Sequence, residues 1–226
     1  MGFGHWDLAV IVYVASFIFG AIVGSFLNVC IIRLPQSKSV VTPPSHCPQC
    51  QSPIRFYDNI PILSYLILRG KCRRCQATIS PQYPIVELIG GTFSLAFILR
   101  YGVSLQYFIY FAFFAALVVI TFIDLRHQII PDIISLSGIP AGFLSSLILP
   151  RLSILDSALG ILIGGGSLLL VAILYHLITK REGMGGGDIK LLAMIGAFLG
   201  WRGAIFGLIA GAFLGSFTGI LLMIAE

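Results

Sequence analysis

The feature that most constrains this 226-residue chain is a series of long apolar segments, beginning with Leu8–Ile32. About 20 apolar residues are enough to cross a bilayer as a helix. Hydrophobic residues make up 58% of the chain and charged residues only 10%, which excludes a soluble globular protein. The segments are continuous rather than alternating, which argues against a β-barrel. The sequence therefore predicts an all-α polytopic membrane protein.

About seven transmembrane helices are expected. The first lacks a basic segment before it and is too long for a signal-peptide core, so we expect it to stay in the membrane. The expected spans are about Leu8–Ile32, Ile85–Leu99, Ser104–Ile123, Ile133–Leu149, Ile154–Ile178, Ile189–Leu199 and Ala204–Ala225. The expected division is a first transmembrane helix at 1–34, a polar loop domain at 35–84 and a larger transmembrane domain at 85–226.

Basic residues fall unevenly on the two sides of these spans. Eleven of the 14 Lys and Arg residues lie on one side, and only Arg100, Arg151 and Arg202 lie on the other. The positive-inside rule assigns the richer side to the cytoplasm. The N-terminus is then outside, whereas the 35–84 loop and the 183–188 turn are inside. Because the net charge of +5 reports topology, no nucleic-acid partner is expected.

The polar loop contains two CxxC pairs, with 21 residues between them. Paired CxxC turns are typical of a four-thiolate structural zinc site. Two disulfides are the alternative, which a reducing cytoplasm disfavours. Four protein ligands leave no position for a reacting water, so we expect the metal to stabilise the loop. The predicted ligands are Cys47, Cys50, Cys72 and Cys75.

A glycine-rich turn, Gly183-Met184-Gly185-Gly186-Gly187, ends in Asp188. Asp188 opens an apolar run, so its carboxylate is expected at the membrane boundary. A charged side chain is energetically costly there, which makes Asp188 a candidate functional residue. The alternative is a helix cap, since an acid at a helix start satisfies free N–H groups. A cap does not need three glycines, whereas glycines let another backbone approach closely.

Asp124 is a second carboxylate at the same predicted depth, at the inner end of the third span. An ion pair with Arg126 is a weak explanation, because residues two apart do not face each other on a helix. If Asp124 and Asp188 pair, they can share one proton. One carboxylate then activates water while its protonated partner donates to the scissile carbonyl oxygen. This arrangement predicts aspartyl proteolysis at a membrane surface.

For the other polar residues near the predicted cytoplasmic face we expect mainly structural roles. Asn28 shares a helix face with Gly24, and we expect it to bond between helices. Arg33 ends the first helix at the interface. Glu87 is either a first-turn acid or a second functional acid facing the loop. Asp132 follows Pro131 and is expected to be a structural first-turn acid.

The order of these motifs resembles the bacterial type IV prepilin peptidases, which are GxGD membrane aspartyl proteases. The matching stretches are Gly24-Ser25-Phe26-Leu27-Asn28-Val29 with Arg33-Leu34-Pro35, the two CxxC pairs, Pro84-Ile85-Val86-Glu87, Ile123-Asp124 through Ile130-Pro131-Asp132, and Gly185-Gly186-Gly187-Asp188-Ile189-Lys190. The resemblance implies cleavage of a basic leader after a glycine, at the cytoplasmic face of the bacterial inner membrane. The implied substrates are type IV prepilins or type II secretion pseudopilins.

The resemblance also implies roles for individual residues. Asp124 and Asp188 match the catalytic pair, and Gly185, Gly186, Gly187 and Lys190 form the loop around it. Many members also methylate the new N-terminus with S-adenosylmethionine. That activity is associated with the N-terminal part, where Gly24, Asn28, Arg33 and Glu87 are the candidate residues for methyl transfer or substrate binding.

Two other classes of function fit the composition less well. A transporter or channel predicts acids near the bilayer midplane and inverted repeats, and neither is found. A non-enzymatic scaffold that binds a pilus or secretion partner through the zinc loop leaves the Gly185–Asp188 turn unexplained. Family members commonly carry a further apolar C-terminal segment, whereas this sequence ends at Glu226, as expected of a short member or a truncated chain.

Overall fold

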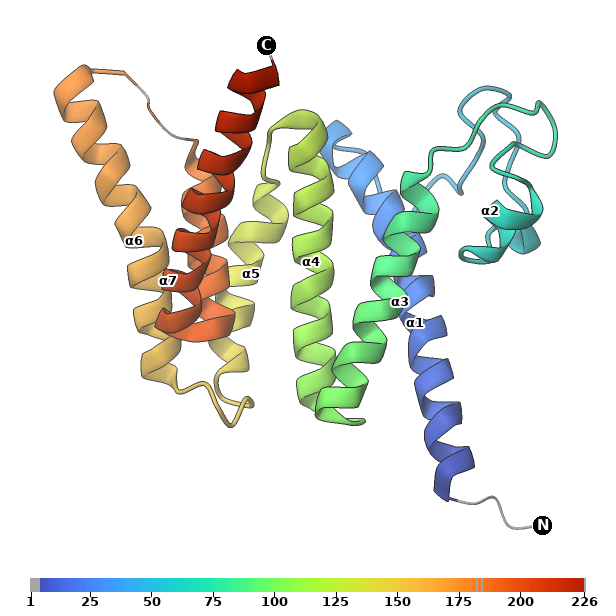
Figure 1. Ribbon diagram of the computed structural model, residues 1–226, viewed down its shortest axis with the longest axis horizontal. Helices are drawn as coiled ribbons and strands as arrows, with labels where there is room; N and C mark the ends of the chain where they lie inside the picture. The colour runs from blue at the N-terminus through green and yellow to red at the C-terminus, as the bar shows by residue number, and fades with distance from the viewer. Residues whose placement is uncertain (1–4, 182, 184, 226) are drawn as a thin grey trace. The chain divides into compact units, whose positions relative to one another are not determined.

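The computed structural model describes residues 5–181, 183 and 185–225 (Figure 1). The described residues are helical apart from turns, loops and two isolated β-bridges, so the predicted all-α fold class is confirmed. The chain forms two compact units, Met1–Gln128 and Ile129–Glu226. The division predicted at residues 34 and 84 stays a prediction.

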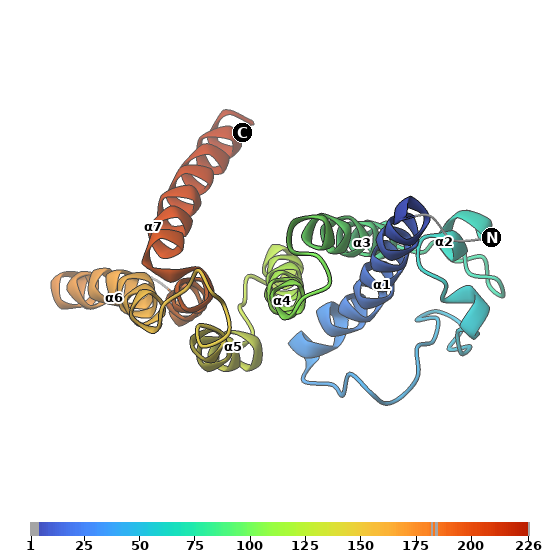
Figure 2. The ribbon, with the colours of Figure 1, turned by 90° about the horizontal axis from the view of Figure 1, so that it is seen from below.

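The first unit is built on three long helices with a loop between the first two. Its elements are α1 (His5–Arg33), the short 3₁₀ helices η1 (Leu34–Gln36) and η2 (Phe56–Asp58), α2 (Leu63–Ile67), α3 (Gln82–Tyr101) and α4 (Leu105–His127). Figures 1 and 2 show α1 and α3 side by side. A Cβ added to Gly20 would lie 2.3 Å from the Gly90 carbonyl oxygen. Glycine is therefore required for this close helix contact.

A buried network of hydroxyl groups links the three long helices of this unit. The Ser94 hydroxyl lies 2.7 Å from the Tyr107 hydroxyl and donates to the Ser16 carbonyl oxygen at 2.7 Å. The Ser16 and Ser94 hydroxyls are 2.9 Å apart. Interhelical hydrogen bonds of this kind stabilise membrane bundles, where water cannot satisfy polar groups.

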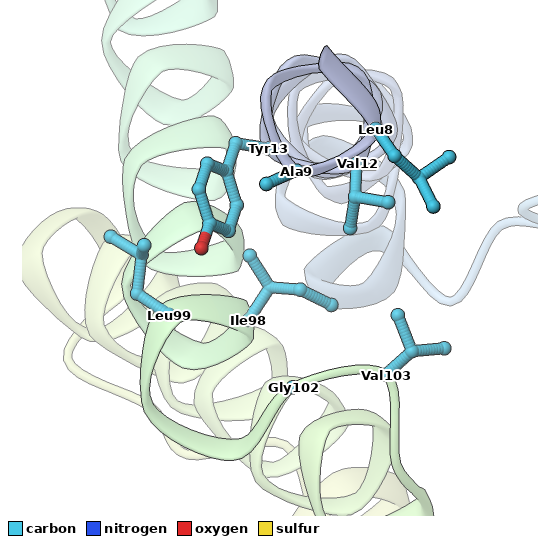
Figure 3. A pocket seen from close by; sticks show the side chains of 8 residues that line it. All are labelled: Leu8, Ala9, Val12, Tyr13, Ile98, Leu99, Gly102 and Val103. Atoms are coloured by element: carbon cyan, nitrogen blue, oxygen red, sulfur yellow. The ribbon is translucent and has the colours of Figure 1, made fainter. Parts of the chain in front are cut away.

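The first unit contains a pocket of about 330 Å³ (Figure 3). It lies between the start of α1 and the connection from α3 to α4. Its lining is aliphatic apart from one phenol: Leu8, Ala9, Val12, Tyr13, Ile98, Leu99, Gly102 and Val103. The pocket contains none of the predicted site residues.

The second unit contains α5 (Asp132–Ser145), α6 (Ile154–Thr179) and α7 (Gly186–Ala225). Gly200 interrupts α7 with φ 73° and ψ −177°, a conformation that favours glycine. The chain reverses there, and a Cβ added to Gly207 would lie 3.2 Å from the Leu192 side chain. The two parts of α7 correspond to the sixth and seventh predicted spans.

Helices α6 and α7 pack closely through glycines. A Cβ added to Gly160 would lie 2.1 Å from the Gly196 carbonyl oxygen, and one added to Gly164 would lie 2.5 Å from the Leu192 carbonyl oxygen. Nothing lies within 4 Å of a Cβ added to Gly166. The Gly164-Gly165-Gly166 run therefore packs closely at its beginning and is open at Gly166.

Five helices of the described chain are long and apolar enough to cross a membrane. They are Leu8–Gln36, Gln82–Tyr101, Leu105–His127, Ile154–Thr179 and Gly186–Leu221. Helix α5 has only 14 residues, and α7 is counted once although Gly200 divides it. The count of seven spans therefore stays a prediction.

Candidate functional site

Two turns of the same geometry carry the four cysteines of the 35–84 loop. In each turn the amide of the first cysteine, Cys47 or Cys72, donates to the carbonyl oxygen five residues later. The carbonyl oxygen of the same cysteine accepts from the amide four residues later. That fourth residue is Gln51 or Gln76, with φ of 55° or 60°. The repeated geometry folds each CxxC sequence so that its two thiols point to one side.

The four thiols converge. Their sulfur atoms all lie within 4.8 Å of one another. The Sγ atoms of Cys47 and Cys75 are 3.8 Å apart, and those of Cys50 and Cys72 are 4.0 Å apart. These separations are far longer than a disulfide bond of about 2.05 Å. They match the edge of about 3.8 Å in a tetrahedron with metal–sulfur bonds of about 2.3 Å. The cluster can therefore bind a metal ion as it stands.

The surroundings of Cys50 favour its thiolate form. The Ser52 hydroxyl lies 3.0 Å from Cys50 Sγ. Hydrogen bonds from the Ser52 hydroxyl and then its backbone amide lower the pKa of Cys50 to about 6. Because metals bind the thiolate, this shift makes a ligand available at neutral pH. His46 is exposed and lies outside the cluster.

A polar cluster joins the loop to the contact between α1 and α3. Asn28 is fully buried, and its amide nitrogen donates to the Gly24 and Tyr83 carbonyl oxygens at 3.3 and 3.1 Å. Its amide oxygen accepts from Gln82 at 3.3 Å. The interhelical role predicted for Asn28 is confirmed. Arg33 instead turns to the loop and donates to carbonyl oxygens of Ser39 and Pro43.

Glu87 lies in the second turn of α3, because that helix begins at Gln82. The first-turn interpretation of Glu87 is therefore wrong. The side chain is only 7% exposed, and its Oε2 atom accepts the Ile62 amide proton at 2.7 Å. A Cβ added to Gly24 would lie 2.7 Å from the Glu87 Cα. Glu87 thus connects the loop to the α1–α3 contact.

Asp124 lies in the last turn of α4 and is exposed. Its carbonyl oxygen accepts from the Gln128 amide at 2.8 Å, and Gln128 ends the helix with φ 53°. Arg126 and His127 also lie in this last turn and are exposed. The carboxylate therefore follows the long apolar stretch of α4, at the predicted end of the span.

Asp188 lies in the first turn of α7 and is exposed. A Cβ added to Gly187 would lie 2.9 Å from Ile130 Cβ, so glycine permits a close contact there. Nothing lies within 4 Å of a Cβ added to Gly185 or Gly186. The turn is thus packed at Gly187 and open beside Gly185 and Gly186. Met184 and Glu182 lie outside the described residues.

Lys190, predicted to belong to the active-site loop, forms an ion pair with Asp132. Its Nζ atom lies 2.7 Å from Asp132 Oδ1. The pair joins the first residue of α5 to the second turn of α7, which agrees with the structural role expected for Asp132. The partners are 58 positions apart and no local pattern links them, so the sequence could not have indicated the pair.

Comparisons with known proteins agree with the arrangement of these motifs. Residues 18–101 match the Bacterial Peptidase A24 N-terminal domain, and residues 111–220 match the Type IV leader peptidase family. The cysteine cluster lies in the first match, and Asp124 and Asp188 lie in the second.

Relatives from several bacteria carry the name prepilin leader peptidase/N-methyltransferase. The protein from Myxococcus xanthus is 38% identical over 92% of this chain and 62% of its own length. Those from Aeromonas hydrophila and Neisseria gonorrhoeae are 37% and 35% identical over 92% of this chain, and the matches cover 80% and 82% of their lengths. This chain thus matches less than two thirds of the Myxococcus protein. No solved structure matches significantly. The family models and the relatives show that this chain belongs to the type IV leader peptidase family.

Proposed function

We propose that this protein is a membrane aspartic endopeptidase that removes the leader of type IV prepilins or pseudopilins and then methylates the new N-terminus. Family membership and the names of the relatives support both activities. The observation that carries the proteolytic part is the position of two carboxylates. Asp124 closes one long apolar helix and Asp188 opens another, and both side chains are exposed. The site faces the cytoplasm, and the N-terminus lies outside the bacterial inner membrane.

Asp124 and Asp188 are the proposed catalytic pair. Two carboxyl groups that share one proton can perform both halves of the reaction. The ionised group takes a proton from water as the water oxygen attacks the scissile carbonyl carbon. The protonated group donates its proton to the carbonyl oxygen. When the tetrahedral species collapses, the C–N bond breaks and the leaving amine takes a proton from the pair. The proton belongs to the pair rather than to either residue.

The glycines before Asp188 are proposed to receive the substrate backbone. The open space beside Gly185 and Gly186 leaves room for an extended peptide next to the carboxylate. Gly187 contacts Ile130, which follows Asp124 by six residues. Lys190 is held by Asp132, and we assign it to positioning this turn.

The metal of the cysteine cluster is proposed to be structural zinc. Four thiolates at tetrahedral spacing match the ligand set that zinc prefers. Cys47, Cys50, Cys72 and Cys75 would hold it, and a closed set of four supplies folding energy rather than a reacting water. S-adenosylmethionine is the proposed methyl donor. Gly24, Asn28, Arg33 and Glu87 are assigned to methyl transfer or substrate binding on the strength of the family resemblance.

The test is cleavage of a synthetic prepilin by the full chain in lipid. Asp124→Asn and Asp188→Asn are each expected to abolish cleavage while the protein still inserts. Asp156→Asn is the matched control, because it removes a carboxylate from the first turn of α6, at the opposite end of that helix from the glycine turn, and changes neither the proposed pair nor the partner of Lys190. Mass spectrometry of the product, with and without S-adenosylmethionine, detects the added methyl group.

Cleavage by either Asn variant would refute the pair. A scaffold predicts a different outcome: both variants would bind a prepilin as the parent does, and the parent would show no turnover.

A further inference from the structure

Helix α2 presents an apolar face that the described protein leaves uncovered. Leu63, Leu66 and Ile67 are 49%, 65% and 66% exposed. They occupy positions i, i+3 and i+4, which share one side of a helix. Ser64 lies off this face and is buried, and its hydroxyl donates to the Tyr57 carbonyl oxygen at 3.0 Å. The large aliphatic side chains therefore point away from the rest of the loop.

The depth of α2 is fixed by its attachment to α3. Helix α3 has 20 residues, so it is about 30 Å long and matches the hydrocarbon thickness of a bilayer. Glu87 lies five residues after the first residue of α3, which is about 7.5 Å inward along the axis. The Ile62 amide, directly before α2, donates to this carboxyl group at 2.7 Å. Figure 1 accordingly shows α2 level with the first turns of α3 rather than beyond its end.

The residues around α2 are strongly basic. Residues 35–84 contain six basic residues and one acidic residue, Asp58. That acid is already paired with Arg73 at 2.6 Å. Three further cations that closely follow α2 are exposed: Arg69, Lys71 and Arg74. Such a surface attracts anionic headgroups and repels a basic peptide.

We propose that α2 is an interfacial anchor that inserts into an anionic lipid leaflet. Leu63, Leu66 and Ile67 lie among the outer parts of the acyl chains, and the basic residues that follow contact the headgroups. An apolar helix face combined with basic residues is the usual composition of a segment that lies in a membrane interface. The anchor holds the cysteine cluster against the membrane surface, which is a role separate from cleavage and methylation.

The test places a single tryptophan on the apolar face. Leu66→Trp is made in a Trp6→Phe/Trp201→Phe background, and the full chain is put into nanodiscs of phosphatidylglycerol and phosphatidylcholine that carry bromine on the acyl chains. Val41→Trp in the same background is the matched control, because Val41 is an exposed apolar residue of the same loop, outside α2. The Leu66→Trp protein is expected to lose most of its emission to bromine quenching, and the Val41→Trp protein little.

Ile67→Trp, in the same background, tests whether the quenching depends on the one position chosen. The metal content of each variant confirms that the cysteine loop is folded. Equal quenching of both α2 variants and the Val41→Trp control would overturn the proposal. Tryptophan emission that is unchanged by brominated lipid but changes when a synthetic prepilin is added would also overturn the proposal. It would show that this face of α2 binds substrate rather than lipid. Replacing Arg69, Lys71 and Arg74 with Gln is expected to reduce quenching, and unchanged quenching would refute the anionic leaflet as the partner.

Discussion

Replacing Glu87 is expected to detach the α2 segment without unfolding the bundle. Ile62 has φ 63°, a conformation that a β-branched residue adopts only at a cost of about 1–3 kcal/mol. The hydrogen bond from its amide to Glu87 offsets this cost. Leaving a buried backbone donor without its hydrogen-bond partner costs about 1–3 kcal/mol. Glu87→Ala removes the acceptor and leaves the backbone strain without compensation.

Hydrogen exchange of the 60–68 segment measures this loss. When exchange reports the opening equilibrium, a loss of about 1–3 kcal/mol makes the Ile62 amide exchange about 5- to 150-fold faster. Glu87→Gln keeps an acceptor oxygen and is expected to give an intermediate effect. Leu88→Ala is the control, because Leu88 is the next residue of α3 and is exposed. If Ile62 exchanges equally fast in the Glu87→Ala and Leu88→Ala proteins, the reasoning fails.

Two further predictions concern the cysteine cluster and the helix packing. In metal-free protein, alkylation of Cys50 should rise with a midpoint near pH 6, because Ser52 lowers its pKa, and Ser52→Ala should move the midpoint toward the ordinary value of about 8.5. The stability that the Cys50 thiolate contributes is present above its ordinary pKa and is lost as the pH falls through about 6. Mass spectrometry measures the alkylation. Equal alkylation midpoints in the parent and the Ser52→Ala protein would exclude the role of Ser52. Gly164→Ala should destabilise the helix pair by about 1–3 kcal/mol because its methyl group meets a backbone carbonyl, whereas Gly166→Ala should be neutral or stabilising. Thermal unfolding in detergent separates the two, and equal transition temperatures would contradict the packing argument.

Local patterns in the sequence were enough to predict most of the architecture. Apolar length predicted the long helices, and the doubled CxxC spacing predicted the thiol cluster that the structure brings together. The position of Asn28 on the Gly24 face predicted its interhelical hydrogen bonds with Tyr83 and Gln82. Each of these inferences depends on periodicity or on closely spaced ligands. These are local properties of the sequence and do not depend on the tertiary arrangement.

The remaining features depend on contacts between distant residues. Glu87 accepts from an amide 25 positions earlier, and Lys190 pairs with a carboxylate 58 positions earlier. Backbone donors carry no side-chain signature, and an exposed acid at a helix start is common enough to suggest only a cap. The short length of α5 was also not predicted, because the apolar sequence continues to Leu149 although the helix ends at Ser145. The pairing of Asp124 with Asp188 joins two separate units and stays a prediction.

The reversal at Gly200 makes the chain intolerant of changes in length. One residue joins the two halves of α7, so no connecting loop exists that could absorb an insertion. Each added residue would rotate the returning half by about 100° about its axis. Ala204, which is 1% exposed, would then leave its position beside α6, and Gly207 would turn away from Leu192. A single codon gained or lost beside Gly200 should therefore be more damaging than most single substitutions in either half.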